Sequence, residues 1–255
     1  MIYYIYSEAV SAIKSKYARY YMLALLGVSI LANLTMIAFR DLIYGTNDGT
    51  YGYNLIMFAG GFFWLPYYTM IFVADMVFGR DYPDPHIRKR SNIGLNRTQL
   101  YLGKLFAAFL VLVLVAVLAF MIFIGVSLLF QVGSGAMEPK IISDFAINLL
   151  IAFPLFLAGI AIGFMCLFCF PKKRTAFILF WVLVIVIPRI IMILGAQPIG
   201  IQFFKSVKNT ILLTPQFTEL QFYATRNVPK VLISSAVYII LSTVIGCIGY
   251  RRRKR

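Results

Sequence analysis

Long apolar runs without charged residues alternate along the chain with short basic segments. An α-helix needs about 20 apolar residues to cross the roughly 30 Å hydrocarbon core of a bilayer. Six runs reach that length, and they lie at about 20–39, 54–78, 105–130, 145–170, 176–195 and 231–250. The alternating pattern of membrane β-barrel strands is not seen. The pattern therefore predicts an all-α polytopic membrane protein, with residues 1–255 forming a single transmembrane domain.

Two segments outside these predicted spans are also apolar. Residues 1–19 place apolar side chains at helical spacing, which predicts an amphipathic helix in the membrane interface; the alternative is an extension of the first span. These side chains are Ile2, Ile5, Tyr6, Ala9, Val10 and Ile13. Residues 196–229 predict an external re-entrant segment of short outer-leaflet helices packed against the bundle, one of them capped by Thr214 ahead of Pro215.

Composition and charge agree with a membrane protein. The chain is 61% hydrophobic and 13% charged, whereas soluble domains contain about 25% charged residues. A net charge of +15 would suggest nucleic acid for a soluble protein. Here the basic residues lie between apolar runs, so we expect a lipid bilayer and no nucleic acid as partner. Seventeen basic residues fall on one side of the predicted bundle and six on the other, which predicts that both termini are cytoplasmic.

Residues suited to catalysis or cofactor binding are scarce. His86 is the single histidine, and Cys166 and Cys169 provide only half of a four-ligand metal site, so the two cysteines are interpreted as packing residues. The phosphate-binding pattern G-x-x-x-x-G-K-(S/T) does not occur in the sequence. The sequence therefore predicts no enzyme activity, no metal and no cofactor in this chain. Any use of ATP would depend on a partner.

Ionisable side chains inside predicted spans are candidate functional groups, because they are costly in a membrane. Asp75 lies near one end of the second span, where it either has a function or reaches the headgroup region. Arg189 follows Pro188 in the fifth span, and its five donors need acceptors. We expect it to face the bundle interior or an aqueous cavity; the alternative is that it snorkels outward. Gly159 and Gly163 form a Gly-x-x-x-Gly motif, which allows close helix packing.

The segment 79–104 between the second and third spans is basic and contains capping residues. Asp84 and Pro85 predict the start of a short helix that ends at Gly94, and Asn96 can cap the next helix. The segment resembles the first cytoplasmic loop of ABC-2 type permeases, which commonly reads I-R-x-x-x-x-x-G-x-(S/N)-R-x-x-x-Y-x-x-K. The matching residues are Ile87, Arg88, Gly94, Asn96, Arg97, Tyr101 and Lys104. The predicted six-span layout, with its N-terminal interfacial helix, is similar to that family as well.

This resemblance implies a mechanism. ABC-2 permeases are membrane subunits of bacterial ATP-binding-cassette exporters, in which two permeases surround a pathway and two separate ATPase subunits bind ATP and Mg. The helix 84–93 would be the coupling helix, and the residues facing the ATPase would be Arg88, Lys89, Arg90, Ile93, Gly94, Asn96 and Arg97. The chain looks most similar to small Gram-positive peptide-export and lantibiotic-immunity permeases. This implies the bacterial cytoplasmic membrane and an amphipathic peptide or other hydrophobic substrate.

Three other functions remain open from the residues alone. A channel or secondary carrier independent of ATP should show several intramembrane carboxylates or an inverted repeat, and neither is found in the sequence. A membrane-embedded enzyme would need a cluster of His, Asp or Glu, which Asp75 alone does not supply. An accessory subunit of an ABC complex is compatible with the sequence. The residues likewise leave open whether the second permease is an identical copy or a related chain.

Overall fold

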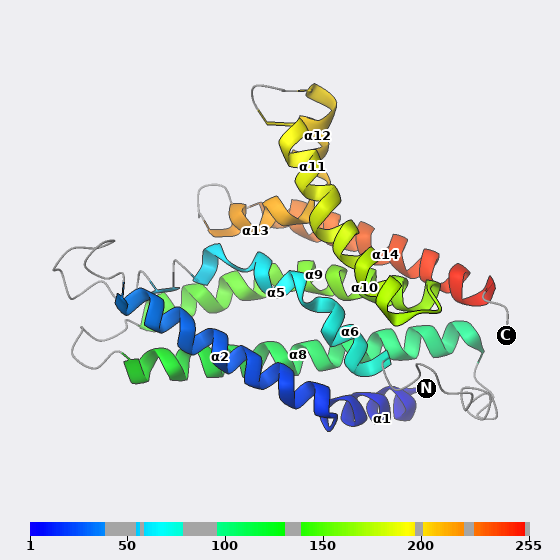
Figure 1. Cartoon of the computed structure of the whole chain (residues 1–255), viewed down its shortest axis with the longest axis horizontal. Coiled ribbons are helices and arrows are strands. Elements are labelled where there is room, and N and C mark those ends of the chain that lie inside the picture. Colours follow the sequence, from blue (N-terminus) through cyan, green and yellow to red (C-terminus); the bar gives the residue numbers. More distant parts are fainter. Residues whose placement is uncertain are drawn as a thin grey trace.

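The computed structural model describes residues 1–38, 55–56, 59–78, 96–130, 139–196, 201–221 and 227–252. Within these residues the structure is helical and contains no strand (Figure 1). Six of its helical segments are long and apolar enough to cross a membrane: Lys16–Thr35, Ala59–Phe78, Arg97–Leu129, Pro139–Cys169, Lys173–Leu194 and Val228–Arg251. The predicted all-α class is therefore confirmed, and the described residues contain six helices of the length and hydropathy that the six predicted spans require.

The helices extend beyond several of the predicted spans. The elements are α1 (Ile2–Ile13), α2 (Lys16–Ala38), α5 (Trp64–Tyr68), α6 (Met70–Phe78), α8 (Arg97–Phe130), α9 (Pro139–Cys169), α10 (Lys173–Trp181), a π-helix (Val182–Val186), α11 (Ile187–Leu194), α12 (Gln202–Thr210), α13 (Leu213–Gln221) and α14 (Val228–Arg252). The prediction began the third and fourth spans directly after the charged residues Lys104 and Asp144. A helix does not stop at the edge of the hydrocarbon, so α8 and α9 begin two turns earlier than predicted.

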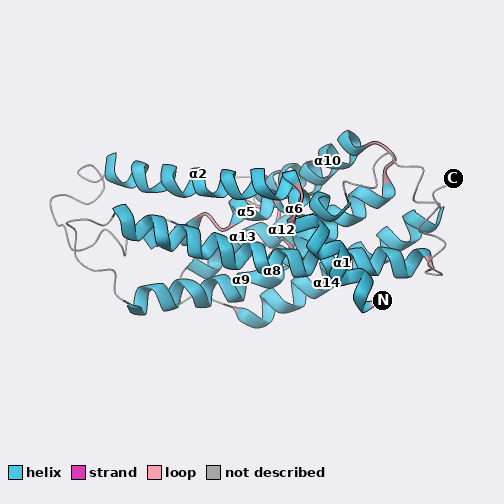
Figure 2. Ribbon diagram, turned by 90° about the horizontal axis from the view of Figure 1, so that it is seen from below, coloured by secondary structure: helices cyan, strands magenta, loops and turns pink. Residues whose placement is uncertain are grey.

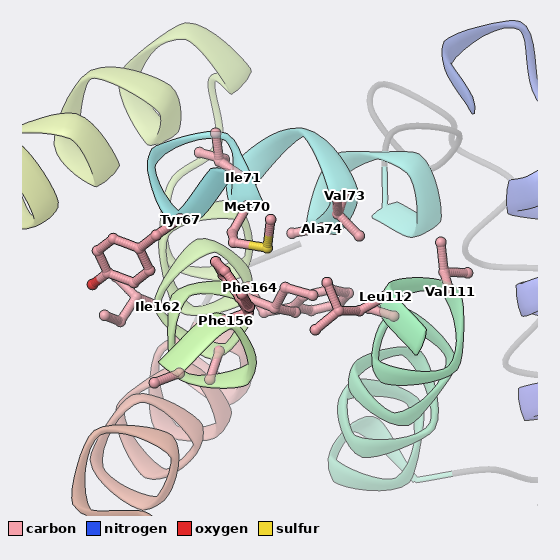
Figure 3. Close-up of a cluster of buried hydrophobic side chains, with 14 of the residues drawn as sticks. Tyr67, Met70, Ile71, Val73, Ala74, Val111, Leu112, Phe156, Ile162 and Phe164 are labelled. Carbon is pink, nitrogen blue, oxygen red and sulfur yellow. The ribbon is translucent and has the colours of Figure 1, made fainter. Parts of the chain in front are cut away.

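Helix α9 forms the centre of the bundle and packs against α6, α8, α10 and α14. Small residues let its neighbours approach closely. A Cβ at Gly159 would lie 2.9 Å from the ring of Tyr67, and one at Gly163 would lie 3.3 Å from the Cβ of Ala74. The Gly-x-x-x-Gly motif therefore lies against α5 and α6. Figure 3 shows Tyr67, Met70 and Ala74 above Phe156 and Phe164 in this buried cluster.

Helix α1 and the last described turn of α14 lie at the same end of the bundle (Figures 1 and 2). We call this the terminal end. It comprises α1, the last turns of α6, α9 and α14, and the first turns of α8 and α10. Helix α1 packs against α8 and α6 there. The side chain of Arg97 at the start of α8 donates a 3.1 Å hydrogen bond to the carbonyl oxygen of Arg251 in α14. An even number of spans produces this arrangement, because each pair of spans returns the chain to its starting side.

The fifth span departs from regular α-helix just before Pro188. Proline has no backbone N–H and cannot complete an ordinary helical turn. The five residues Val182–Val186 instead form a π-helix between α10 and α11. Such π-helical turns release backbone strain within helices and bend them. Figure 1 shows α11 and α12 leaning away from the other helices.

The described parts of the segment 196–229, which was predicted to be external, differ in part from the prediction. Helix α13 packs against α9 and α14, with Leu213, Phe217 and Leu220 buried. Helix α12 contains no buried residue and contacts α11 instead. The expectation that the apolar segment packs on the bundle therefore holds for α13 and is wrong for α12. Helix α13 also begins at Leu213, so Thr214 lies within its first turn and is not the cap.

Candidate functional site at the terminal end

An ion pair between α1 and α8 lies inside the terminal end. The Nζ atom of Lys104 is 3.5 Å from a carboxylate oxygen of Glu8, and the two side chains are 6% and 11% exposed. The same Nζ donates a 3.5 Å hydrogen bond to the carbonyl oxygen of Val77, near the end of α6. Helix ends leave carbonyl groups without helical partners, and a lysine is a suitable donor to them. One buried lysine thus joins α1, α6 and α8.

A second ion pair joins α6 to α10. The Nζ atom of Lys173 lies 2.5 Å from Oδ2 of Asp75, which is buried, while Lys173 itself is about one third exposed. The ammonium group also lies 5.2 Å from the ring centre of Tyr17 in α2 and 5.7 Å from that of Phe177 in α10. Aromatic faces attract cations at such distances. Asp75 is therefore a buried partner of Lys173 and not an exposed side chain.

Tyr101 in α8 lies where α8, α9 and α14 meet. Its side chain is fully buried, and its ring packs against those of Phe164 and Phe168. A Cβ on Gly246 of α14 would lie 2.7 Å from Cζ of Tyr101, so only glycine fits there without displacement. Cys169 packs in the same way against Gly249. This close packing holds α14 against the start of α8 and the end of α9.

Two of the predicted coupling residues lie in the described structure. Asn96 precedes α8 and caps it: its side-chain oxygen accepts a 2.9 Å hydrogen bond from the N–H of Arg97, and its own N–H donates to Oε1 of Gln99 at 2.9 Å. The Asn96–Gln99 contact is half of a capping box. The predicted residues Arg88, Lys89, Arg90, Ile93 and Gly94, and also His86, lie outside the described residues.

The segment predicted as the loop 79–104 ends earlier than expected. Residues 97–104 belong to α8, and Lys104 and Tyr101 are buried on one face of its first turns. From the sequence, Lys104 was expected to be a loop cation, and neither lysine–carboxylate pair of the terminal end was expected. One signal was available, because Tyr101 and Lys104 are three residues apart and share a helix face.

Arg189 does not occupy the position that was expected inside the bundle. Its side chain is exposed on α11, the part of the fifth span that leans away from the other helices. The π-helix turns this end of the span outward, so the expectation of an interior position in its own chain is wrong. Among the described residues, no group of three or more His, Cys, Asp or Glu is suited to hold a metal.

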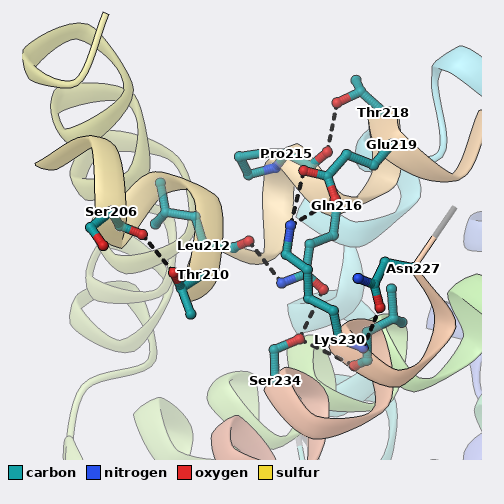
Figure 4. Close-up of polar contacts among 11 residues, drawn as sticks. Ser206, Thr210, Leu212, Pro215, Gln216, Thr218, Glu219, Asn227, Lys230 and Ser234 are labelled. Carbon is teal, nitrogen blue, oxygen red and sulfur yellow. Dashed lines mark hydrogen bonds and ion pairs between the residues drawn. The ribbon is translucent and has the colours of Figure 1, made fainter. Parts of the chain in front are cut away.

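A polar network ties α13 to α14 far from these pairs (Figure 4). The hydroxyl of Ser234 donates a 2.8 Å hydrogen bond to Oε1 of the buried Gln216, and Lys230 pairs with Glu219 at 2.7 Å. An open groove of about 340 Å³ lies beside it, lined by Thr210, Ile211, Lys230, Ile233, Ser234, Val237 and Tyr238. The polar groups of the network bond to one another, so the network holds α13 against α14.

No protein-family model, curated protein or solved structure matches the chain. The residues and their geometry are therefore the basis for any functional assignment.

Proposed function

We propose that the chain is a permease subunit of an ATP-binding-cassette exporter of the ABC-2 type. In this proposal it pairs with a second permease, identical or related, in a bacterial cytoplasmic membrane, with both termini cytoplasmic. Two separate ATPase subunits supply the ATP and Mg chemistry. The substrate is an amphipathic peptide or another hydrophobic molecule.

The observation that carries the proposal is the division of the loop motif into buried and surface residues. Tyr101 and Lys104 are buried and hold the start of α8 against α1, α9 and α14. Asn96 is exposed and Arg97 is half-buried at the outer rim of the same end. A loop that receives force from an ATPase needs a fixed base and an accessible outer surface, and the burial of the four described motif residues fits both requirements.

The two ion pairs add to this support. The segment 79–95 connects the end of α6 to the start of α8. Lys104 contacts the end of α6 through Val77, while Asp75 in α6 pairs with Lys173 in α10. A displacement of the loop would therefore reach α1 and the fifth span through ionic contacts. In the proposed mechanism, closure of the ATPases moves the coupling helix 84–93, and these contacts transmit the motion to the spans.

Purification of the tagged chain from its native membranes in mild detergent tests the proposal. We expect a near-stoichiometric soluble protein that contains G-x-x-x-x-G-K-(S/T), identified by mass spectrometry. Its reproducible absence from an intact, monodisperse preparation would reject the permease assignment. The chain would then be tested as a channel or secondary carrier. Recovery of the ATPase only together with another complete permease pair would indicate an accessory subunit.

The predicted ATPase-facing surface has its own test. We expect replacement of Arg88, Lys89 and Arg90 by alanine to reduce the ATPase retained per chain by about tenfold or more. Removing one partner of a charge pair at an interface leaves the other charge without its partner, which weakens binding strongly. Membrane insertion and helix content should be unchanged. A matched variant that replaces Lys140, Lys205 and Lys208 loses the same charge elsewhere and should retain the ATPase. Normal retention in the first variant would refute the coupling assignment.

A further inference from the structure

Two arginines meet where α8 and α14 touch at the terminal end. Nη1 of Arg97, the first residue of α8, donates a 3.1 Å hydrogen bond to the carbonyl oxygen of Arg251 near the end of α14. In return, Nε and Nη2 of Arg251 donate to the hydroxyl oxygen of Thr98 at 3.1 and 2.8 Å. Each guanidinium group is therefore held by the helix opposite its own, and both cationic groups lie at the same helix junction.

No described carboxylate neutralises these two arginines. The acidic side chains described at the terminal end are Glu8 and Asp75, and each lies against a lysine. The acceptors that hold the two guanidinium groups are a carbonyl and a hydroxyl oxygen, and neither carries a charge. A guanidinium group is permanently charged and has five N–H donors. Most of these donors have no partner among the described residues, so the pair is able to bind an external anion.

Close packing fixes the backbone beneath the two arginines. Gly246 of α14 lies against Tyr101 of α8, and Gly249 lies against the end of α9. Arg97 is half-buried and Arg251 is exposed, so their guanidinium groups reach the surface from a rigid base. Arg97 is also the first residue of one candidate span, and Arg251 is the last residue of another. Both arginines thus lie at the level where a span leaves the hydrocarbon and the headgroup region begins.

We propose that Arg97 and Arg251 form a phosphate-binding site at the junction of α8 and α14, and that the phosphate belongs to the head group of an anionic phospholipid. The planar fork of a guanidinium group matches two phosphate oxygens, and such charge-assisted hydrogen bonds are strong. A bound phosphate also offsets the repulsion between the two positive charges. Basic pockets between transmembrane helices are known to hold anionic head groups.

The surface beside the arginine pair favours a lipid over a free phosphate ion. Ile248 and Val244 precede Arg251 by three and seven residues, so they lie on the same face of α14. Their side chains are 46% and 49% exposed. A phospholipid held by its phosphate can therefore place an acyl chain along this apolar strip. The inference requires two packed helices in a membrane and does not depend on the proposed transport function.

Native mass spectrometry of the delipidated full-length chain in neutral detergent tests the inference. The chain is titrated with phosphatidylglycerol or with phosphatidylcholine, and the bound fraction gives an apparent dissociation constant for each lipid. We expect phosphatidylglycerol to bind about tenfold or more tightly, because the choline of the other lipid brings a further positive charge to the arginines. Inorganic phosphate at the concentration of the lipid should not displace phosphatidylglycerol. Displacement by inorganic phosphate would overturn the lipid as the source of the bound phosphate.

Two variants of the site separate its geometry from its charge. Arg97→Lys combined with Arg251→Lys keeps the net charge and loses both planar forks, so phosphatidylglycerol should bind about fivefold or more weakly. Thr98→Val keeps both arginines and removes the hydroxyl that holds one of them, and it should weaken binding in the same direction. Circular dichroism and the elution volume in size-exclusion chromatography check that each variant folds as the unmodified chain does.

A matched control removes charge from the same end of the bundle. Lys172 and Arg174 are exposed at the start of α10, away from the junction of α8 and α14. Their joint replacement by glutamine should leave the affinity for phosphatidylglycerol unchanged. Equal affinity of the unmodified chain for the two lipids would overturn the inference. Unchanged binding in the double lysine variant, or an equal loss in the control, would also overturn it.

Discussion

Replacing Gly246 by alanine is expected to lower the free energy of unfolding by about 2 kcal/mol, because overpacking a close-packed interior typically costs 1–3 kcal/mol. The added Cβ would lie 2.7 Å from Cζ and 2.8 Å from Cε2 of Tyr101. Tyr101 is fully buried against Phe164 and Phe168, so its ring has no open space into which to move. Unfolding of the purified chain by sodium dodecyl sulfate in mixed micelles measures the change.

A second substitution identifies the cause of that loss. The hydroxyl of Tyr101 is buried and has no hydrogen-bond partner among the described residues. Tyr101→Phe is therefore expected to be neutral or stabilising, since a buried polar group without a partner costs about 1–3 kcal/mol. Combined with Gly246→Ala, it should restore at least half of the lost stability. The control Gly125→Ala, where a Cβ meets nothing within 4 Å, should be neutral or slightly stabilising. If the stability of the double variant equals the sum of the two single effects, the contact between Gly246 and Tyr101 does not cause the loss in Gly246→Ala.

Replacing Lys173 by methionine is expected to destabilise the protein by about 2 kcal/mol. Removing one partner from a fully buried ion pair costs about 3–5 kcal/mol, and the partial exposure of Lys173 reduces this value. The cost arises because Asp75 is buried and loses the counter-ion that stabilises its carboxylate. Replacing the other partner, Asp75→Asn, should lower the free energy of unfolding by less than about 1 kcal/mol. Lys173 lies at the start of α10, so its ammonium group can turn toward water.

The double variant of this pair provides the decisive comparison. Asp75→Asn combined with Lys173→Met removes both charges, and we expect most of the stability to return. Lys172→Met alters the neighbouring exposed lysine and should change stability little. The same unfolding titration measures all four variants. Equal losses for Lys173→Met and for the double variant would mean that packing around the lysine stem, and not the charge of Asp75, determines the effect.

The proposed exporter mechanism depends on the same buried pairs. Asp75 and Lys173 connect α6 to α10, and Glu8 and Lys104 connect α1 to α8. Because the segment 79–95 lies between α6 and α8 in the chain, a force on it would act on both pairs. Some variants of these ion pairs should still fold stably. ATPase binding measured with such variants would test whether binding at the loop requires a rigid terminal end.

The sequence by itself determined that six helices are long and apolar enough to span a membrane. Each span is a continuous apolar run whose length is set by the thickness of the bilayer, so a local pattern carries the information. The cap at Asn96 was also predictable, because a cap and the helix that it starts are adjacent in the chain. The break before Pro188 follows from the missing N–H of one residue.

Only the tertiary structure decided which charged and apolar groups meet. Asp75 and Lys173 are 98 positions apart, and nothing local in the sequence pairs them. Lys104 resembled a loop cation because the charge pattern alone does not show the helix packing that buries this residue against Glu8. Arg189 was expected inside the bundle, but the outward lean of α11 exposes it. The apolar positions of α1 form two faces because α6 and α8 cover one of them and leave the other exposed. Burial is a property of the neighbours that a helix packs against, and those neighbours are fixed only when the whole bundle has assembled.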